Sequence, residues 1–66
     1  MKASVALFVL EHGSAAPEPA VPFDVEGERD DDLRAAAIEA IRARGLRVRA
    51  VSFGPRGLTA YAEREA

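Results

Sequence analysis

The chain has 66 residues, a formal net charge of −2 at pH 7 and no cysteine. This length is near the lower limit for a stable domain, because a chain of this size buries only about 60% of the surface that it exposes when unfolded. The lack of cysteine excludes a disulfide framework and zinc–thiolate sites, and the acidic balance excludes a uniformly basic surface for nucleic acid.

The hydrophobic residues are mostly small. They make up 48% of the chain, but 14 of them are alanine, which leaves 18 larger apolar side chains to form a core. Small domains usually need disulfides, a metal ion or self-association to be stable. With no cysteine and a single histidine, self-association is the expected supplement, and we expect a homodimer.

Charge is unevenly distributed along the chain. Residues 11–32 contain eight acidic residues and one arginine, whereas residues 40–62 contain five arginines and no acidic residue. We expect these two halves to pair with each other across a sheet, because opposite charges stabilise cross-strand neighbours. In the alternative interpretation, the arginines face an anionic partner.

Residues 3–10 form a continuous apolar run rich in Val, Leu and Phe, which predicts a central strand covered on both faces. Alternation places Phe8 and Leu10 on the face opposite Val5. The run resembles the start of a short signal peptide, but the single lysine before it and Glu11 after it argue against cleavage. Eight apolar residues are too few for a bilayer, which needs about 20, so we expect a cytoplasmic protein without membrane contact.

The next segment, residues 11–22, is rich in proline. Residues 11–22 contain Pro17, Pro19 and Pro22, and this composition predicts an extended surface loop. Residues 21–26 then alternate apolar and acidic side chains, which predicts a half-buried strand. Pro22 lacks an N–H group, so this strand suits the edge of a sheet.

A helix is predicted to begin near Asp30 and to end at Gly45. The carboxylate of Asp30 can cap the first turn, and acidic residues there suit the positive end of the helix dipole. Glycine readily adopts the left-handed conformation that ends helices. At 100° per residue, the following residues form one apolar stripe: Leu33, Ala36, Ala37, Ala40 and Ile41. Its alanines allow the helix to approach a sheet closely.

Two further strands are predicted over residues 46–53 and 58–63. The sequence GPRG between them suits a hairpin turn, with proline at the second position and glycine where φ is positive. Taken together, these elements predict an α+β fold in which a single helix packs on a four-stranded, mainly antiparallel sheet. The order is β-β-α-β-β, in one domain over residues 1–66 with a Pro-rich loop at 11–22.

Few residues offer catalytic chemistry. His12 is the one imidazole and lies at the edge of the predicted loop, so a preorganised nucleophile and base are not expected. Asp30, Asp31 and Asp32 could attract a hard cation, but neighbouring helical carboxylates point about 100° apart and capping already explains them. We therefore expect no enzyme activity, no cofactor and no metal site.

Alternation predicts a mixed surface on the sheet face opposite the helix. This face would gather Phe8, Leu10, Asp24, Glu26, Arg47, Arg49, Val51, Phe53, Thr59 and Tyr61. Aromatic residues and arginine are enriched in protein interfaces. The first hypothesis is therefore a non-catalytic protein-interaction module that self-associates through this face or a strand edge, with these anchors: Phe8, Val51, Phe53 and Tyr61.

The alternative hypothesis is a module for single-stranded nucleic acid. Arg47, Arg49 and Arg56 would neutralise phosphates, while an aromatic ring on the same face stacks on bases. The chain lacks the glycine–aromatic strand signature of such modules, and the acidic residues Asp24 and Glu26 would repel a phosphate backbone. We therefore expect a protein partner, either a second copy of this chain or another protein, rather than nucleic acid.

Overall fold

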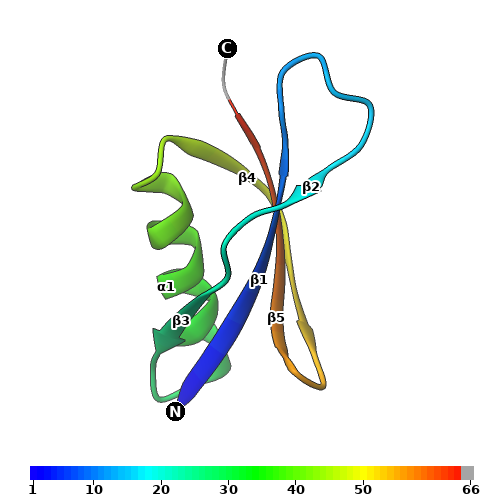
Figure 1. The fold of residues 1–66 in the computed structure, drawn as a ribbon. Coiled ribbons are helices and arrows are strands. Elements are labelled where there is room, and N and C mark those ends of the chain that lie inside the picture. The colour runs from blue at the N-terminus through cyan, green and yellow to red at the C-terminus, as the bar shows by residue number, and fades with distance from the viewer. Residues whose placement is uncertain (65–66) are drawn as a thin grey trace.

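The structure is a computed structural model that describes residues 1–64 (Figure 1). Its elements, in chain order, are β1 (Lys2–Leu10), β2 (Glu18–Pro19), β3 (Phe23–Glu26), α1 (Asp30–Arg42), β4 (Leu46–Gly54) and β5 (Gly57–Arg64). The α+β class and the β-β-α-β-β order predicted from the sequence are confirmed, with the two-residue β2 as an addition inside the predicted loop.

The sheet is mixed, and its two central strands are parallel. The strand order is β2-β1-β5-β4, and β3 pairs with the same edge of β1 as β2 does. The pairing of β1 with β5 is parallel, whereas the pairings of β1 with β2, of β1 with β3 and of β4 with β5 are antiparallel. The sheet is therefore mostly antiparallel and has two outer edges, one formed by β2 and β3 and the other by β4.

The outer strand along β1 is interrupted where the prolines lie. Residues of β3 pair with Lys2–Val5, whereas Glu18 and Pro19 of β2 pair farther along β1. The segment between them contains Pro22, which cannot donate a ladder hydrogen bond. This explains why β3 begins at Phe23, two residues later than the alternation predicts.

The helix α1 packs on one face of the sheet, as Figure 1 shows. Its N-cap is Arg29 rather than Asp30, and the carboxylate of Asp32 accepts a hydrogen bond from the Arg29 backbone N–H (3.1 Å). The helix ends at Arg42 with Ala43 as its C-cap residue. Gly45 follows in the predicted left-handed conformation, with a φ of 78° and an N–H that donates to the Arg42 carbonyl. Within residues 1–64, no helix is long and apolar enough to cross a membrane.

The core lies between α1 and the sheet and contains no aromatic ring. Its buried residues are Val5, Leu7, Val9, Val25, Leu33, Ala37, Ile41, Leu46, Leu58, Ala60 and Ala62. Ala37 on the helix and Ala60 on β5 are fully buried, so both layers contribute small side chains to the core. The predicted helix stripe is confirmed, because Leu33, Ala37 and Ile41 are its buried members.

Gly57 begins β5 in a conformation that favours glycine. Its φ is +126°, and a Cβ atom at this position would overlap the backbone carbonyl oxygen of Ser4. Because that oxygen belongs to the central strand β1, the clash could be relieved only by moving the sheet apart. This glycine therefore allows the hairpin end of β5 to approach β1.

We predict that Gly57→Ala lowers the free energy of unfolding by about 3 kcal/mol or more, because the cost of a strained φ and the cost of the overlap with the Ser4 backbone add together. Gly45→Ala is the matched control: φ is also positive there, but the added Cβ meets nothing within 4 Å, so only the left-handed strain of about 1 kcal/mol is expected. Urea denaturation of both variants measures the difference. Equal losses in the two variants would contradict the close approach of Gly57 to Ser4.

Candidate functional site

The face of the sheet opposite α1 is uncovered, and we call it the open face. Cross-strand partners lie on the same face, so the register defines its members. They are Lys2, Ser4, Ala6, Phe8, Leu10, Pro19, Asp24, Glu26, Arg47, Ala50, Ser52, Thr59, Tyr61 and Glu63. Val5, Leu7 and Val9 are buried under the helix, which confirms the predicted alternation of the first strand. The prediction that this strand is covered on both faces is wrong within the described chain, because Ser4 and Ala6 are exposed and Phe8 and Leu10 are only half-buried.

Two aromatic rings stack at the centre of the open face. Phe8 of β1 and Tyr61 of β5 are cross-strand neighbours, with ring centroids 5.4 Å apart and planes inclined by 22°. Tyr61 is 41% exposed, while Phe8 is half-buried and has the half-buried Leu10 two residues farther along its strand. An aromatic pair of this kind contributes about 0.5–1.5 kcal/mol beyond its burial. The stacking holds the two rings beside each other on this face.

The other two predicted anchors lie on the opposite side of the sheet. A β-bulge between Val48 and Ala50 inserts an extra residue into β4, so the alternation reverses after it. Val51 is then paired with the buried Ala60 and packs against the core, and Phe53 is paired with the buried Leu58. The prediction that Val51 and Phe53 share the open face with Tyr61 is therefore wrong.

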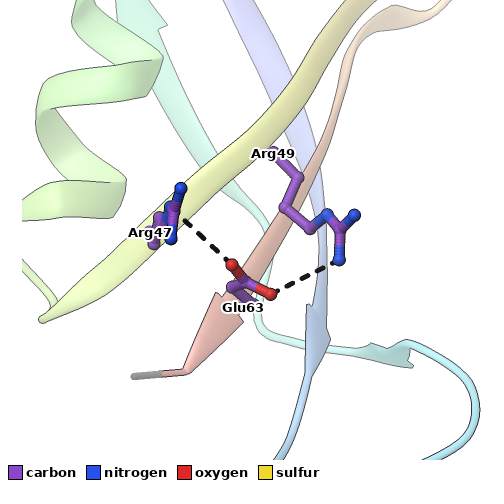
Figure 2. Close-up of polar contacts among 3 residues, drawn as sticks. All are labelled: Arg47, Arg49 and Glu63. Atoms are coloured by element: carbon purple, nitrogen blue, oxygen red, sulfur yellow. Dashed lines mark hydrogen bonds and ion pairs between the residues drawn. The ribbon is translucent and has the colours of Figure 1, made fainter. Parts of the chain in front are cut away.

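The arginines of β4 gather around one carboxylate, as Figure 2 shows. Arg47 Nε lies 3.7 Å from Glu63 Oε1, and Arg49 Nη1 lies 3.4 Å from Glu63 Oε2. Both arginine side chains are more than half exposed, so each pair stabilises the fold by at most about 1 kcal/mol. One carboxylate shared by two guanidinium groups leaves this end of β4 with an excess of positive charge.

The predicted pairing between the acidic and basic halves of the chain is wrong. In the described residues, the arginines of residues 40–62 form ion pairs only with Glu39 and Glu63, and Lys2 is the residue that pairs with Asp24. The topology explains this, because β3 and β4 form opposite edges of the sheet. One edge is therefore acidic and the other is basic.

Arg56, the third arginine of the nucleic-acid hypothesis, lies away from the other two. It is exposed in the turn between β4 and β5, at the opposite end of β4 from Arg47. It helps to line a hollow of about 330 Å³ beside the small side chains of Ser4, Ala6 and Thr59. The three arginines therefore do not form one basic surface around the stacked rings.

Two further arginine contacts lie outside the open face. Arg44, just after α1, places its guanidinium 4.3 Å from the ring centre of Phe23. Arg64 Nε donates hydrogen bonds to both carboxylate oxygens of Glu11, at 2.8 and 3.1 Å. These hydrogen bonds, together with the opposite charge, hold the pKa of the Glu11 carboxyl below its ordinary value and raise the pKa of Arg64. The two hydrogen bonds connect the last residue of β5 to the residue that follows β1.

Groups that could react or bind metal are dispersed. Within residues 1–64, no three His, Cys, Asp or Glu side chains are placed to hold a metal ion. His12 is exposed in the turn after β1, and none of the side-chain hydrogen bonds of the described chain joins a hydroxyl group to a base. What the described surface offers is an uncovered face with two stacked rings and a sheet with oppositely charged edges.

The chain matches no family model, and no curated protein or solved structure is significantly similar to it.

We predict that Glu11 titrates at lower pH in the native chain than in Arg64→Gln, because that variant removes both hydrogen bonds. A folded-state pKa below the unfolded value means that the pair stabilises the fold above the unfolded pKa and that this stabilisation is lost as pH falls through the folded pKa. NMR titration of the carboxyl carbon measures the shift. Arg56→Gln removes the same charge elsewhere and should leave Glu11 unchanged; an equal effect of both variants would contradict the contact.

Proposed function

We propose that this protein is a small, non-catalytic interaction module that self-associates through its open face. The observation that carries the proposal is the placement of its aromatic residues. None of the four is fully buried, although Phe23 packs against the core: Phe8, Phe23, Phe53 and Tyr61. Aromatic rings normally dominate the cores of domains and the centres of interfaces. A chain this small that leaves its rings incompletely buried can gain stability by burying them against a partner.

The open face combines apolar and charged side chains in an arrangement that suits contact with a partner. The stacked rings of Phe8 and Tyr61 occupy its centre, small side chains such as Ala6 and Ala50 lie beside them, and charged residues lie toward its edges. A polar rim around an apolar centre is typical of protein interfaces. The extents of the molecule, 37 × 22 × 17 Å, allow a sheet face to bury about 800 Å² per partner, the standard size of a specific interface.

A second copy is the proposed partner of the open face because the core is small and no disulfide supports it. Eleven buried residues, three of them alanine, form the core, and its largest fully buried side chains are Ile41 and Val5. Domains of this size commonly depend on a disulfide, a metal ion or oligomerisation. The chain has no cysteine, so burial of the open face by an identical open face is the supplement that the sequence and the geometry favour.

The nucleic-acid alternative is less well supported. Glu63 contacts both Arg47 and Arg49, and the acidic side chains of Asp24 and Glu26 lie on the same face as the stacked rings. Titration with a labelled single-stranded oligonucleotide distinguishes the two functions. Affinity that falls steeply as salt rises would favour the alternative, because phosphate neutralisation releases counterions.

We predict that Tyr61→Asp weakens self-association at least about tenfold, since it places a charge at the centre of the apolar patch. Size-exclusion chromatography with light scattering over a concentration series measures the change. Phe53→Asp is the matched control, because Phe53 is similarly exposed (47% against 41%) but lies on the other side of the sheet. It should leave the dimer intact.

Two results would contradict the proposed function. One is a native protein that stays monomeric at concentrations of about 100 μM and above, where a specific dimer of micromolar affinity forms. The other is a dimer that dissociates in Phe53→Asp and persists in Tyr61→Asp. Circular dichroism and thermal unfolding of each variant confirm that it is folded before its mass is interpreted.

A further inference from the structure

The edge formed by β4 is the one continuous strand edge in the described chain. β4 pairs only with β5, so its outer side is unpaired over nine residues, Leu46–Gly54. The opposite edge of the sheet consists of two short segments, β2 and β3, with Pro22 between them. Unpaired N–H and C=O groups along an edge strand are a template for another strand.

The bulge limits the regular part of this edge to its second half. From Ala50 to Gly54, every residue of β4 has one partner on β5, ending at the pair of Gly54 with Gly57. The bulge at Arg49 precedes this stretch, and Pro55 follows it. Five residues of regular edge are enough for the short strands that add to sheets in peptide recognition.

Apolar side chains accompany this stretch on the helix side. Val51 is half-buried against the core, and Phe53, two residues farther, is 47% exposed. A strand that adds to β4 presents every second side chain to the same side as these two residues. Cross-strand contact with an aromatic and a β-branched side chain is favourable. A partner with apolar residues at alternate positions would therefore cover the exposed ring of Phe53.

The positive charge of the β4 edge favours an acidic partner strand. Residues 46–57 contain three arginines and no acidic residue. Arg49 stands before the regular stretch and shares Glu63 with Arg47, while Arg56 stands after it and forms no ion pair within the described chain. Both ends of the stretch are thus positive. A strand with acidic residues at its ends complements them.

The same charges disfavour a second copy at this edge. Antiparallel pairing of two β4 strands about Ser52 would oppose Val51 of one copy to Phe53 of the other, which is favourable. It would also bring Arg49 of one copy beside Arg56 of the other at both ends, and like charges in neighbouring cross-strand positions are destabilising. An acidic strand gains the apolar contacts without this repulsion.

We propose that the β4 edge from Ala50 to Gly54 binds an extended acidic segment of a partner protein by strand addition. The segment is four to five residues of extended chain, with apolar side chains at alternate positions toward Phe53 and carboxylates that reach Arg49 and Arg56. This site is separate from the open face, so a dimer formed by the open face leaves it available.

The test uses three blocked nine-residue peptides and the full chain labelled with ¹⁵N. The first peptide alternates glutamate and valine, the second alternates lysine and valine, and the third is the acidic peptide with its central valine replaced by proline. We expect the acidic peptide to shift the backbone amide signals of residues 49–56, and the lysine and proline peptides to bind at least about tenfold more weakly. Absence of shifts at 50–54, or equal binding of the acidic and lysine peptides, would overturn the proposal.

Two variants locate the peptide. Phe53→Ser should weaken binding of the acidic peptide at least about fivefold, while Tyr61→Ser, which removes a ring of similar exposure from the open face, should leave binding unchanged. The reverse result would place the peptide on the open face and overturn the proposal. Signals of residues 50–54 that shift on dilution of Tyr61→Asp without peptide would show a second copy at the edge, because the open-face dimer is weakened in that variant, and this result would also overturn the proposal. Because Tyr61 governs the dimer and Phe53 the peptide, the two proposals fail separately.

Discussion

The parallel pairing of β1 with β5 under the single helix is the constraint on which the rest of the structure depends. Buried residues of both strands, such as Leu7 and Ala60, form the floor of the core, and Ala37 and Ile41 of α1 cover them. Because these strands take the centre of the sheet, β3 and β4 become its edges. Because residues 1–64 contain a single helix, the other face stays uncovered in the described chain, and Figure 1 shows this one-sided arrangement.

Local patterns predicted most elements, whereas pairing between distant segments could not be predicted. The apolar run in residues 3–10, Gly45 after the helix and the sequence GPRG each specify local structure. Strand order depends on contacts far apart in sequence, so the expectation that the acidic and basic halves pair was wrong once β3 and β4 became opposite edges. The bulge did leave a signal: the apolar residues Val48, Val51 and Phe53 are spaced by three and then by two, which breaks the strand period of two.

That bulge changes the functional interpretation of the whole surface. Strict alternation would have assembled four anchors on the open face, but the extra residue leaves Phe8 and Tyr61 there and moves Val51 and Phe53 to the helix side of β4. The molecule therefore presents two separate aromatic surfaces. One is a broad sheet face, which we propose binds a second copy, and the other is a narrow, positively charged edge, which we propose binds an extended acidic strand. Neither surface requires a catalytic group, and both arise from how a short chain distributes a few rings around an aliphatic core.

The central claim is that the bulge at Arg49 divides the aromatic residues between two sides of the sheet. The most direct test is a set of nuclear Overhauser contacts measured on the native protein. The account predicts contacts between the rings of Phe8 and Tyr61, and between the methyl groups of Val51 and Ala60. An isotope-filtered experiment on a mixed sample excludes contacts between two copies. Contacts from the Phe53 ring or the Val51 methyl groups to the ring of Tyr61 within one molecule would contradict the account, because they would require uninterrupted alternation along β4.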